Sequence, residues 1–75
     1  MRYLNILFIE YNDGTNTKKA MYEAETELDC LARHHSLLGT NMVAENVKHV
    51  LSIAVDTSNG FVIAMENFVR EEGEN

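Results

Sequence analysis

Residues 2–11 form a segment that is apolar on both of the faces that a β-strand would present. β-Branched and aromatic side chains dominate the segment, as is typical of strands. Successive side chains of a strand point to opposite sides, so alternate residues share a face. The two faces carry Leu4, Ile6 and Phe8 on one side, and Leu7 and Ile9, flanked by Tyr3 and Tyr11, on the other. Because neither set is polar in the manner of a solvated sheet face, this strand requires cover on both sides.

The second strand and the helix are indicated by the residues that precede them. Asp13-Gly14 can adopt the positive φ of a tight turn and predicts a hairpin to a second strand at about 17–24. Thr26, followed by acidic residues, is typical of a helix N-cap. Apolar residues then recur at three- and four-residue spacing, which predicts a helix that starts near residue 27 and ends between residues 38 and 44.

The same spacing predicts which side of the helix is buried. The expected apolar stripe consists of Leu28, Leu31, Ala32, His35, Leu38 and Met42. On this pattern His35 lies at the margin of the core with its ring nitrogens hydrogen-bonded. His34, one position round the helix, is expected to face solvent or a partner subunit.

The last third of the chain predicts a second hairpin. Strands are expected over Val47–Asp56 and from Phe61 to about Val69, joined by a turn at Asn59-Gly60. The order is therefore ββαββ, an α+β fold with a small antiparallel sheet and one helix on one face. A chain of 75 residues has room for one domain, expected over residues 1–69. Residues 70–75, with three glutamates, are expected to form a disordered acidic tail.

One short helix covers only one face of such a sheet. The fourth strand repeats the two-sided apolar pattern less completely, with Phe61, Ile63 and Met65 on one face. An uncovered second face would exceed the apolar patch that monomers usually expose, so we expect a homo-oligomer, most simply a two-fold dimer. The alternative is a monomer in which residues 39–46 fold over the second face.

The balance of charges excludes one class of function. The chain has 12 acidic and 6 basic residues and a net charge of -6. Phosphate neutralisation requires clustered lysine and arginine, so we expect no direct binding to nucleic acid. No apolar run approaches the roughly 18 residues of a membrane span, so we expect no membrane partner. A single cysteine and an N-terminus without the apolar block of a signal peptide favour the cytoplasm.

Candidate catalytic or metal-binding residues are few. Cys30 and His34 lie four positions apart and share a helix face, a spacing that suits a metal-ligand pair or a thiol beside a base. No second pair at a recognised spacing is added by the other candidates, Asp29, His35, Glu45 and His49. The chain also contains no glycine-rich phosphate loop and no nucleophile elbow around a serine. We therefore expect a protein without metal or cofactor that is not an enzyme.

Several segments resemble a group of short phage and prophage proteins from Gram-positive gut bacteria. The resemblance extends over residues 3–68 and lies in residues 19–23, 27–36, 46–48 and 50–56 and the Asn59-Gly60 turn. In that group a strand pair is followed by a helix with an aromatic-His step and by a closing hairpin. His35 matches the histidine of the group, whereas His34 stands where the group has an aromatic residue. The resemblance implies a phage origin.

A phage origin in turn implies a role against host defence. The resemblance favours a homo-oligomer that sequesters a cyclic or ADP-ribose-type signalling nucleotide in the cytoplasm of an infected bacterium. Cations would bind the phosphates, Tyr22 would stack on a base, and polar side chains would hydrogen-bond. The expected ligand-binding residues are Lys18, Lys19, Tyr22, Arg33, His35, Thr40, Asn41 and Lys48. The alternatives are an acidic inhibitor that imitates nucleic acid and binds a host effector, and a structural protein that only self-associates.

Overall fold

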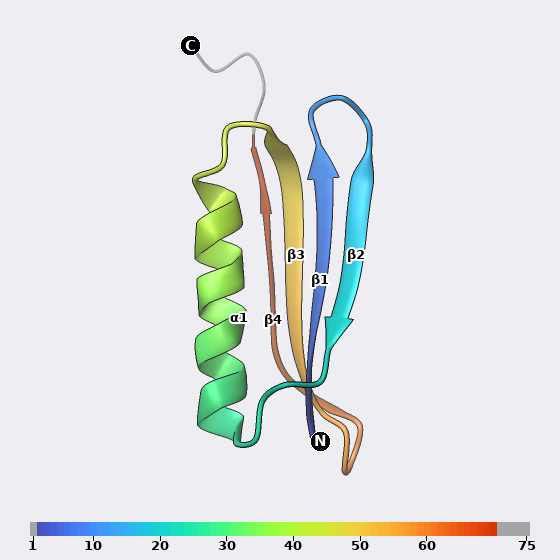
Figure 1. The fold of residues 1–75 in the computed structure, drawn as a ribbon, viewed down its shortest axis with the longest axis vertical. Coiled ribbons are helices and arrows are strands. Elements are labelled where there is room, and N and C mark those ends of the chain that lie inside the picture. Colours follow the sequence, from blue (N-terminus) through green and yellow to red (C-terminus); the bar gives the residue numbers. More distant parts are fainter. Residues whose placement is uncertain (1, 71–75) are drawn as a thin grey trace.

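The computed structural model describes residues 2–70, which form one four-stranded sheet with one helix against it (Figure 1). The elements are β1 (Tyr3–Tyr11), β2 (Asn16–Met21), α1 (Glu27–Met42), β3 (Val47–Asp56) and β4 (Phe61–Val69). The strand order in the sheet is β2-β1-β3-β4, and every neighbouring pair is antiparallel. The predicted α+β fold with the order ββαββ is confirmed.

Turn residues close both hairpins. Gly14 and Gly60 have φ angles of 92° and 77°, a region that side chains with a Cβ rarely adopt. In the second hairpin, the Asp56 carboxylate accepts hydrogen bonds from the backbone N–H and the hydroxyl of Ser58. Both predicted turns are therefore found where the Asp-Gly and Asn-Gly steps place them.

The second strand is shorter than expected, because the chain leaves the sheet after Met21. Three residues later Ala24 is fully buried, in a cluster with Tyr3, Cys30 and Ala54. The small methyl group of Ala24 packs beneath the first turns of the helix. If β2 continued along the edge of the sheet beyond Met21, Ala24 would not lie in this position. This contact fixes the point at which the chain turns towards α1.

The helix covers one face of the sheet only. α1 contacts β3, β1 and β4 and has no contact with β2 (Figure 1). Alternate residues of β1 and β3 beneath the helix are buried, and they are Tyr3, Asn5, Leu7 and Ile9 in β1 and Val50, Ser52, Ala54 and Asp56 in β3. Ala44, in the connection after the helix, packs against the same core. The alternative in which residues 39–46 cover the second face is therefore wrong.

The buried side of α1 differs from the predicted stripe. Cys30 and His34 are its fully buried residues, whereas Leu28 is 78% exposed and His35 is exposed. The prediction that His35 faces the core and His34 faces outward is thus wrong. The physical reason is that the His34 ring hydrogen-bonds to two side chains of the sheet, and this rotates the helix away from its most apolar side.

Arg70 belongs to the folded unit and not to a tail. Its guanidinium donates hydrogen bonds to the backbone carbonyls of Met42, Ala44 and Val47, at 2.9–3.0 Å. A cation in this place satisfies carbonyl groups at the end of α1 and complements the helix dipole. The remainder of the predicted acidic tail, residues 71–75, lies outside the described residues.

Asp56 links the start of β1 to the end of β3 and makes the fold sensitive to acid. The Ser58 hydroxyl and the Arg2 guanidinium both hydrogen-bond to its carboxylate, and they hold the pKa of Asp56 below its ordinary value. A carboxyl with a depressed pKa stabilises the fold above its unfolded pKa of about 4, and this contribution is lost as the pH falls through the folded value.

We therefore expect Asp56→Asn to lower the free energy of unfolding at neutral pH and to flatten its decline in acid. Urea denaturation across the acid range measures both effects. The exposed Glu25, substituted to Gln, is the matched control, and we expect it to keep the acid decline of the unmodified protein. Equal acid profiles for Asp56→Asn and the unmodified protein would contradict this role.

Candidate functional site

A chain of polar side chains crosses the core between α1, β3 and β4. His34 is fully buried, and its Nδ1 lies 2.9 Å from the Ser52 Oγ. Its Nε2 lies 2.6 Å from the Glu66 Oε1. Ser52 and Glu66 are paired residues of β3 and β4, so the strand register places both beneath the helix. Both nitrogens of the His34 ring are therefore hydrogen-bonded and the ring orientation is fixed.

His35 extends this chain to the surface. Its Nδ1 lies 3.8 Å from the same Glu66 Oε1, and its ring meets the His34 ring edge-on with centroids 5.0 Å apart. The side chains of His35 and Glu66 are 64% and 50% exposed. We call these four residues, His34, His35, Ser52 and Glu66, the histidine cluster. It is rigid at its buried end and open to solvent at its outer end.

The histidine cluster has the residue types of a serine hydrolase triad but not the accessibility. Ser52 is fully buried, so its hydroxyl cannot reach a substrate carbonyl. A catalytic serine also requires oxyanion donors beside it, and a buried strand residue offers none. The arrangement is suited to holding the His34 ring in place.

Cys30, one turn before His34, is likewise unsuited to nucleophilic chemistry. Its thiol is buried against the Leu4 carbonyl, and burial is the main cause that raises the pKa of Cys30, with the Asp29 charge adding to it. The thiolate, which is the reactive form, is therefore disfavoured. Cys30 and His34 do share the buried helix face, as their spacing predicts, but Cys30 packs in the core.

A cleft of about 280 Å³ lies where α1 leaves β2 uncovered. Its lining consists of Asn5, Met21, Glu23, Arg33, Ser36 and Leu37. Asn5 is 1% exposed and donates its Nδ2 hydrogen to the Cys30 carbonyl, while its Oδ1 has no hydrogen-bond partner among residues 2–70. A buried amide oxygen without a partner is costly, so Asn5 marks the cleft as a place where a hydrogen-bond donor would stabilise the protein.

Arg33 forms one wall of the cleft. Its guanidinium contacts the Glu23 carboxylate at 2.9 Å and the Asp29 carboxylate at 3.3 Å. These acids, Asp29 first, raise the pKa of Arg33, so the side chain stays cationic. The side chain is 42% exposed, which leaves the guanidinium open to an anion on its outer side.

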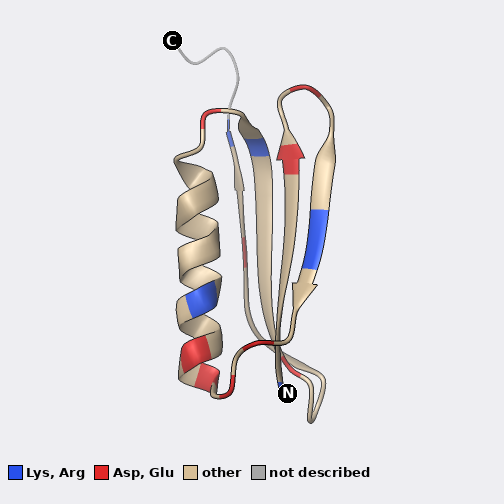
Figure 2. Cartoon of the chain, viewed as in Figure 1, with Lys and Arg blue, Asp and Glu red and all other residues tan. Residues whose placement is uncertain are grey.

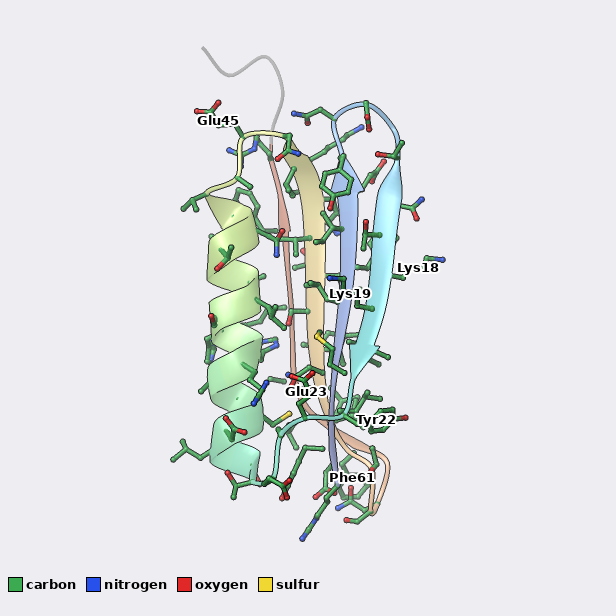
Figure 3. The ribbon with its side chains drawn as sticks, viewed as in Figure 1. Lys18, Lys19, Tyr22, Glu23, Glu45 and Phe61 are labelled. Atoms are coloured by element: carbon green, nitrogen blue, oxygen red, sulfur yellow. The ribbon has the colours of Figure 1, made fainter. Side chains whose placement is uncertain are left out.

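The predicted ligand-binding residues are distributed over the molecule. Lys19 pairs with the buried Leu7 and so lies on the helix side of the sheet, as Arg33 does. Lys18 lies on the opposite side, with its Nζ 5.8 Å from the Phe8 ring, and Tyr22 is exposed after β2 (Figure 3). The other four lie elsewhere: His35 beside β4, Thr40 and Asn41 in the last turns of α1, and Lys48 at the start of β3. Within one chain, Arg33 and Lys19 therefore both lie on the helix side of the sheet.

The second face of the sheet is apolar and has no cover from residues 2–70. We call it the open face. It consists of half-buried Leu4, Ile6, Phe8, Leu51, Ile53 and Val55 and of exposed Val62 and Met65. Figure 2 shows that most acidic residues lie elsewhere, in loops, at strand ends and in the first turns of α1. The two-sided apolar pattern predicted for the first strand is therefore present in the fold. In β4 the register shift beside Val55 places Val62 with Met65 on the open face and packs Ile63 against the core, so the prediction that Ile63 and Met65 share a face is wrong.

Sequence reasoning missed Ser52 and Glu66. A signal for both residues exists, because each is a polar residue at an inward position of an alternating strand. Ser52 lies between the buried Val50 and Ala54, and Glu66 lies between Ala64 and Phe68. A polar residue at such a position requires a partner, and His34 is the helix residue that provides one.

Comparison of the chain with known protein families, curated proteins and solved structures finds no match. Among residues 2–70, no helix combines the length and the apolar composition needed to cross a membrane. The cleft, the histidine cluster and the open face are therefore the features of the molecule that indicate a function.

Substitution of Ser52 tests whether the histidine cluster holds α1 in place. We expect Ser52→Ala to lower the free energy of unfolding by about 1–3 kcal/mol, because it leaves the buried Nδ1 of His34 without a partner. The exposed Ser36, substituted to Ala, is the control and is expected to change stability by less than about 0.5 kcal/mol. Chemical denaturation measures both. Equal losses in the two variants would show that the hydrogen bond to Ser52 contributes nothing.

Proposed function

We propose that the protein is a non-catalytic binding protein that works as a homodimer, with the open faces of two copies packed together. The observation that carries this proposal is the open face itself. Its central side chains, Ile6 and Ile53, are paired across β1 and β3, and Met65 extends them onto β4. Apolar patches of this extent mark interaction sites, and a second copy supplies a surface of the same character.

The size of the open face suits a dimer. The three longer strands have nine or ten residues, so a four-stranded sheet at the usual rise and strand spacing presents a face of about 30 by 19 Å. Two such faces in contact bury on the order of 1,100 Å², which reaches the size expected of a specific interface. The burial also supplements a core that is small for an independent domain.

The charges of the open face also favour a second copy. The chain carries a net charge of -6, so two copies repel each other wherever acidic surfaces meet. On the same side of the sheet as the open face, near one of its ends, lie Glu10 and Lys18, which have opposite charges, while the open face itself is apolar. This is the side on which two acidic molecules approach each other at the least electrostatic cost.

The cleft beside β2 is the site that we propose for a small ligand. Arg33 offers a planar guanidinium for a phosphate group, Lys19 adds a second cation on the same side, and Asn5 offers an unpartnered acceptor. These groups support a ligand that carries both an anionic group and a hydrogen-bond donor. Cyclic and ADP-ribose-type nucleotides, which the resemblance to phage proteins favours, meet that description. In this proposal the protein acts against host defence in the cytoplasm of an infected bacterium.

Charge substitutions on the open face test the dimer. We expect the unmodified protein to sediment with twice the mass of the chain, and the double variant Val62→Lys with Met65→Lys to sediment as a folded monomer. Both side chains are more than half exposed in the single chain, so the substitutions do not disturb its core. Analytical ultracentrifugation gives the mass, and circular dichroism verifies the fold.

The control for this experiment is Leu28→Lys, since Leu28 is 78% exposed on the helix, away from the open face. We expect that variant to remain dimeric. A monomeric unmodified protein, or a dimer that is lost in Leu28→Lys and retained in the double variant, would refute the open-face interface.

A panel of cyclic dinucleotides, cyclic trinucleotides and cyclic ADP-ribose isomers tests the ligand. A ligand at 100 times its dissociation constant adds about 2.7 kcal/mol to the free energy of unfolding, so binding raises the melting temperature. We expect Arg33→Gln to abolish the rise. Lys18→Gln, on the opposite side of the sheet, is expected to retain it. The nucleotide proposal fails if no member of the panel shifts the melting temperature of the unmodified protein.

A further inference from the structure

We propose that His34, His35 and Glu66 bind a divalent transition-metal ion of the zinc type, with one coordination position left for an external ligand. The donor atoms are the His34 Nε2, the His35 Nδ1 and a carboxylate oxygen of Glu66. This site is separate from the cleft and from the open face, and the inference does not rest on the proposed dimer or its ligand.

The three donor groups lie close enough to share one ion. Their donor atoms are all within 4.8 Å of one another. Glu66 Oε1 is 2.6 Å from His34 Nε2 and 3.8 Å from His35 Nδ1. Zinc bonds of about 2.0–2.2 Å place tetrahedral donors roughly 3.4 Å apart, a value between these two distances. The outer side chains, His35 and Glu66, are at least half exposed, so small rotations adjust both separations.

The buried end of the histidine cluster orients the first ligand. In the metal-free chain the His34 Nε2–H donates to the Glu66 carboxylate at 2.6 Å. When an ion takes the place of that proton, the ring carries its proton on Nδ1, this N–H donates to the Ser52 Oγ at 2.9 Å, and the Nε2 lone pair faces the ion. A hydrogen bond from the second ring nitrogen to a neighbouring group is the usual way in which proteins orient a metal-binding histidine. Because the ring is fully buried, its position is set before any ion arrives.

The charge of Glu66 also favours a cation. Within the described part of the chain, its ion-pair partners are the two histidines, and no lysine or arginine pairs with it. Two imidazoles and one carboxylate form a ligand set that suits zinc, whereas calcium and magnesium prefer oxygen ligands alone. Three protein ligands leave a position open, unlike the closed four-ligand set of a structural zinc site.

Residue spacing in the sequence indicates a different pair of metal ligands. Cys30 and His34 share a face, but the Cys30 thiol packs in the core beside Ala24 and Ala54. The ligands that the fold provides are two adjacent histidines of α1 and a residue of β4 that lies 31 positions after His35 in the chain. Only the packing of α1 on β4 brings them together, and for this reason the sequence alone leads to the expectation of no metal.

Titration of the chelator-treated full chain with zinc tests the proposal. We expect calorimetry to show one ion per chain and a rise in melting temperature on addition of zinc. Loss of a residue that only hydrogen-bonds to a metal ligand weakens metal affinity about 10–100-fold. His35 and Glu66 are ligands themselves in this proposal, so we expect His35→Ala and Glu66→Gln each to weaken zinc binding by at least about tenfold. Nitrogen-15 spectra of the histidine rings are expected to show a shift of the His34 Nε2 on zinc addition.

The control is His49→Ala, because the His49 ring packs edge-on against Phe8 and lies outside the histidine cluster. We expect it to bind zinc as the unmodified protein does. Since His35 is exposed, His35→Ala retains the fold, which circular dichroism verifies. Absence of zinc binding to the unmodified protein, or equal affinity in His35→Ala and the unmodified protein, would overturn the proposal.

Discussion

One helix of 16 residues lies against a sheet that carries apolar side chains on both faces, and much of the structure follows from the fact that one helix covers only one of them. The helix packs against β3, β1 and β4. Two regions are left without cover as a consequence. The first is the helix side of β2, which becomes the cleft beside Arg33. The second is the whole open face, which supports the proposed dimer.

The orientation of the helix depends on a polar interaction and not on its most apolar side. His34 occupies the centre of the buried helix face because Ser52 and Glu66 together satisfy both of its ring nitrogens. Burying this ring leaves Leu28 in solvent. The two hydrogen bonds therefore offset the loss of apolar burial on that side. The same rotation places His35 beside Glu66, so the proposed metal site is a direct result of how α1 packs.

The sequence predicts the class of the fold and the positions of most elements, because alternation, capping residues and turn glycines are local signals. Thr26, Gly14 and Gly60 have the roles that their residue types indicate. The buried side of α1 was predicted wrongly because it depends on the register between β3 and β4, which no local pattern encodes. Glu66 was missed for the same reason. Arg70 was placed in the tail because its partners are carbonyl groups of residues distant in sequence.

The central claim is that a second copy of the chain covers the open face. Isotope-filtered nuclear Overhauser spectra of a mixture of labelled and unlabelled protein test it most directly, since they report contacts between copies alone. The account predicts intermolecular contacts among the methyl groups of Ile6, Ile53 and Met65. Spectra without such contacts, or with contacts that involve only Leu28 and other methyl groups of α1, would contradict it.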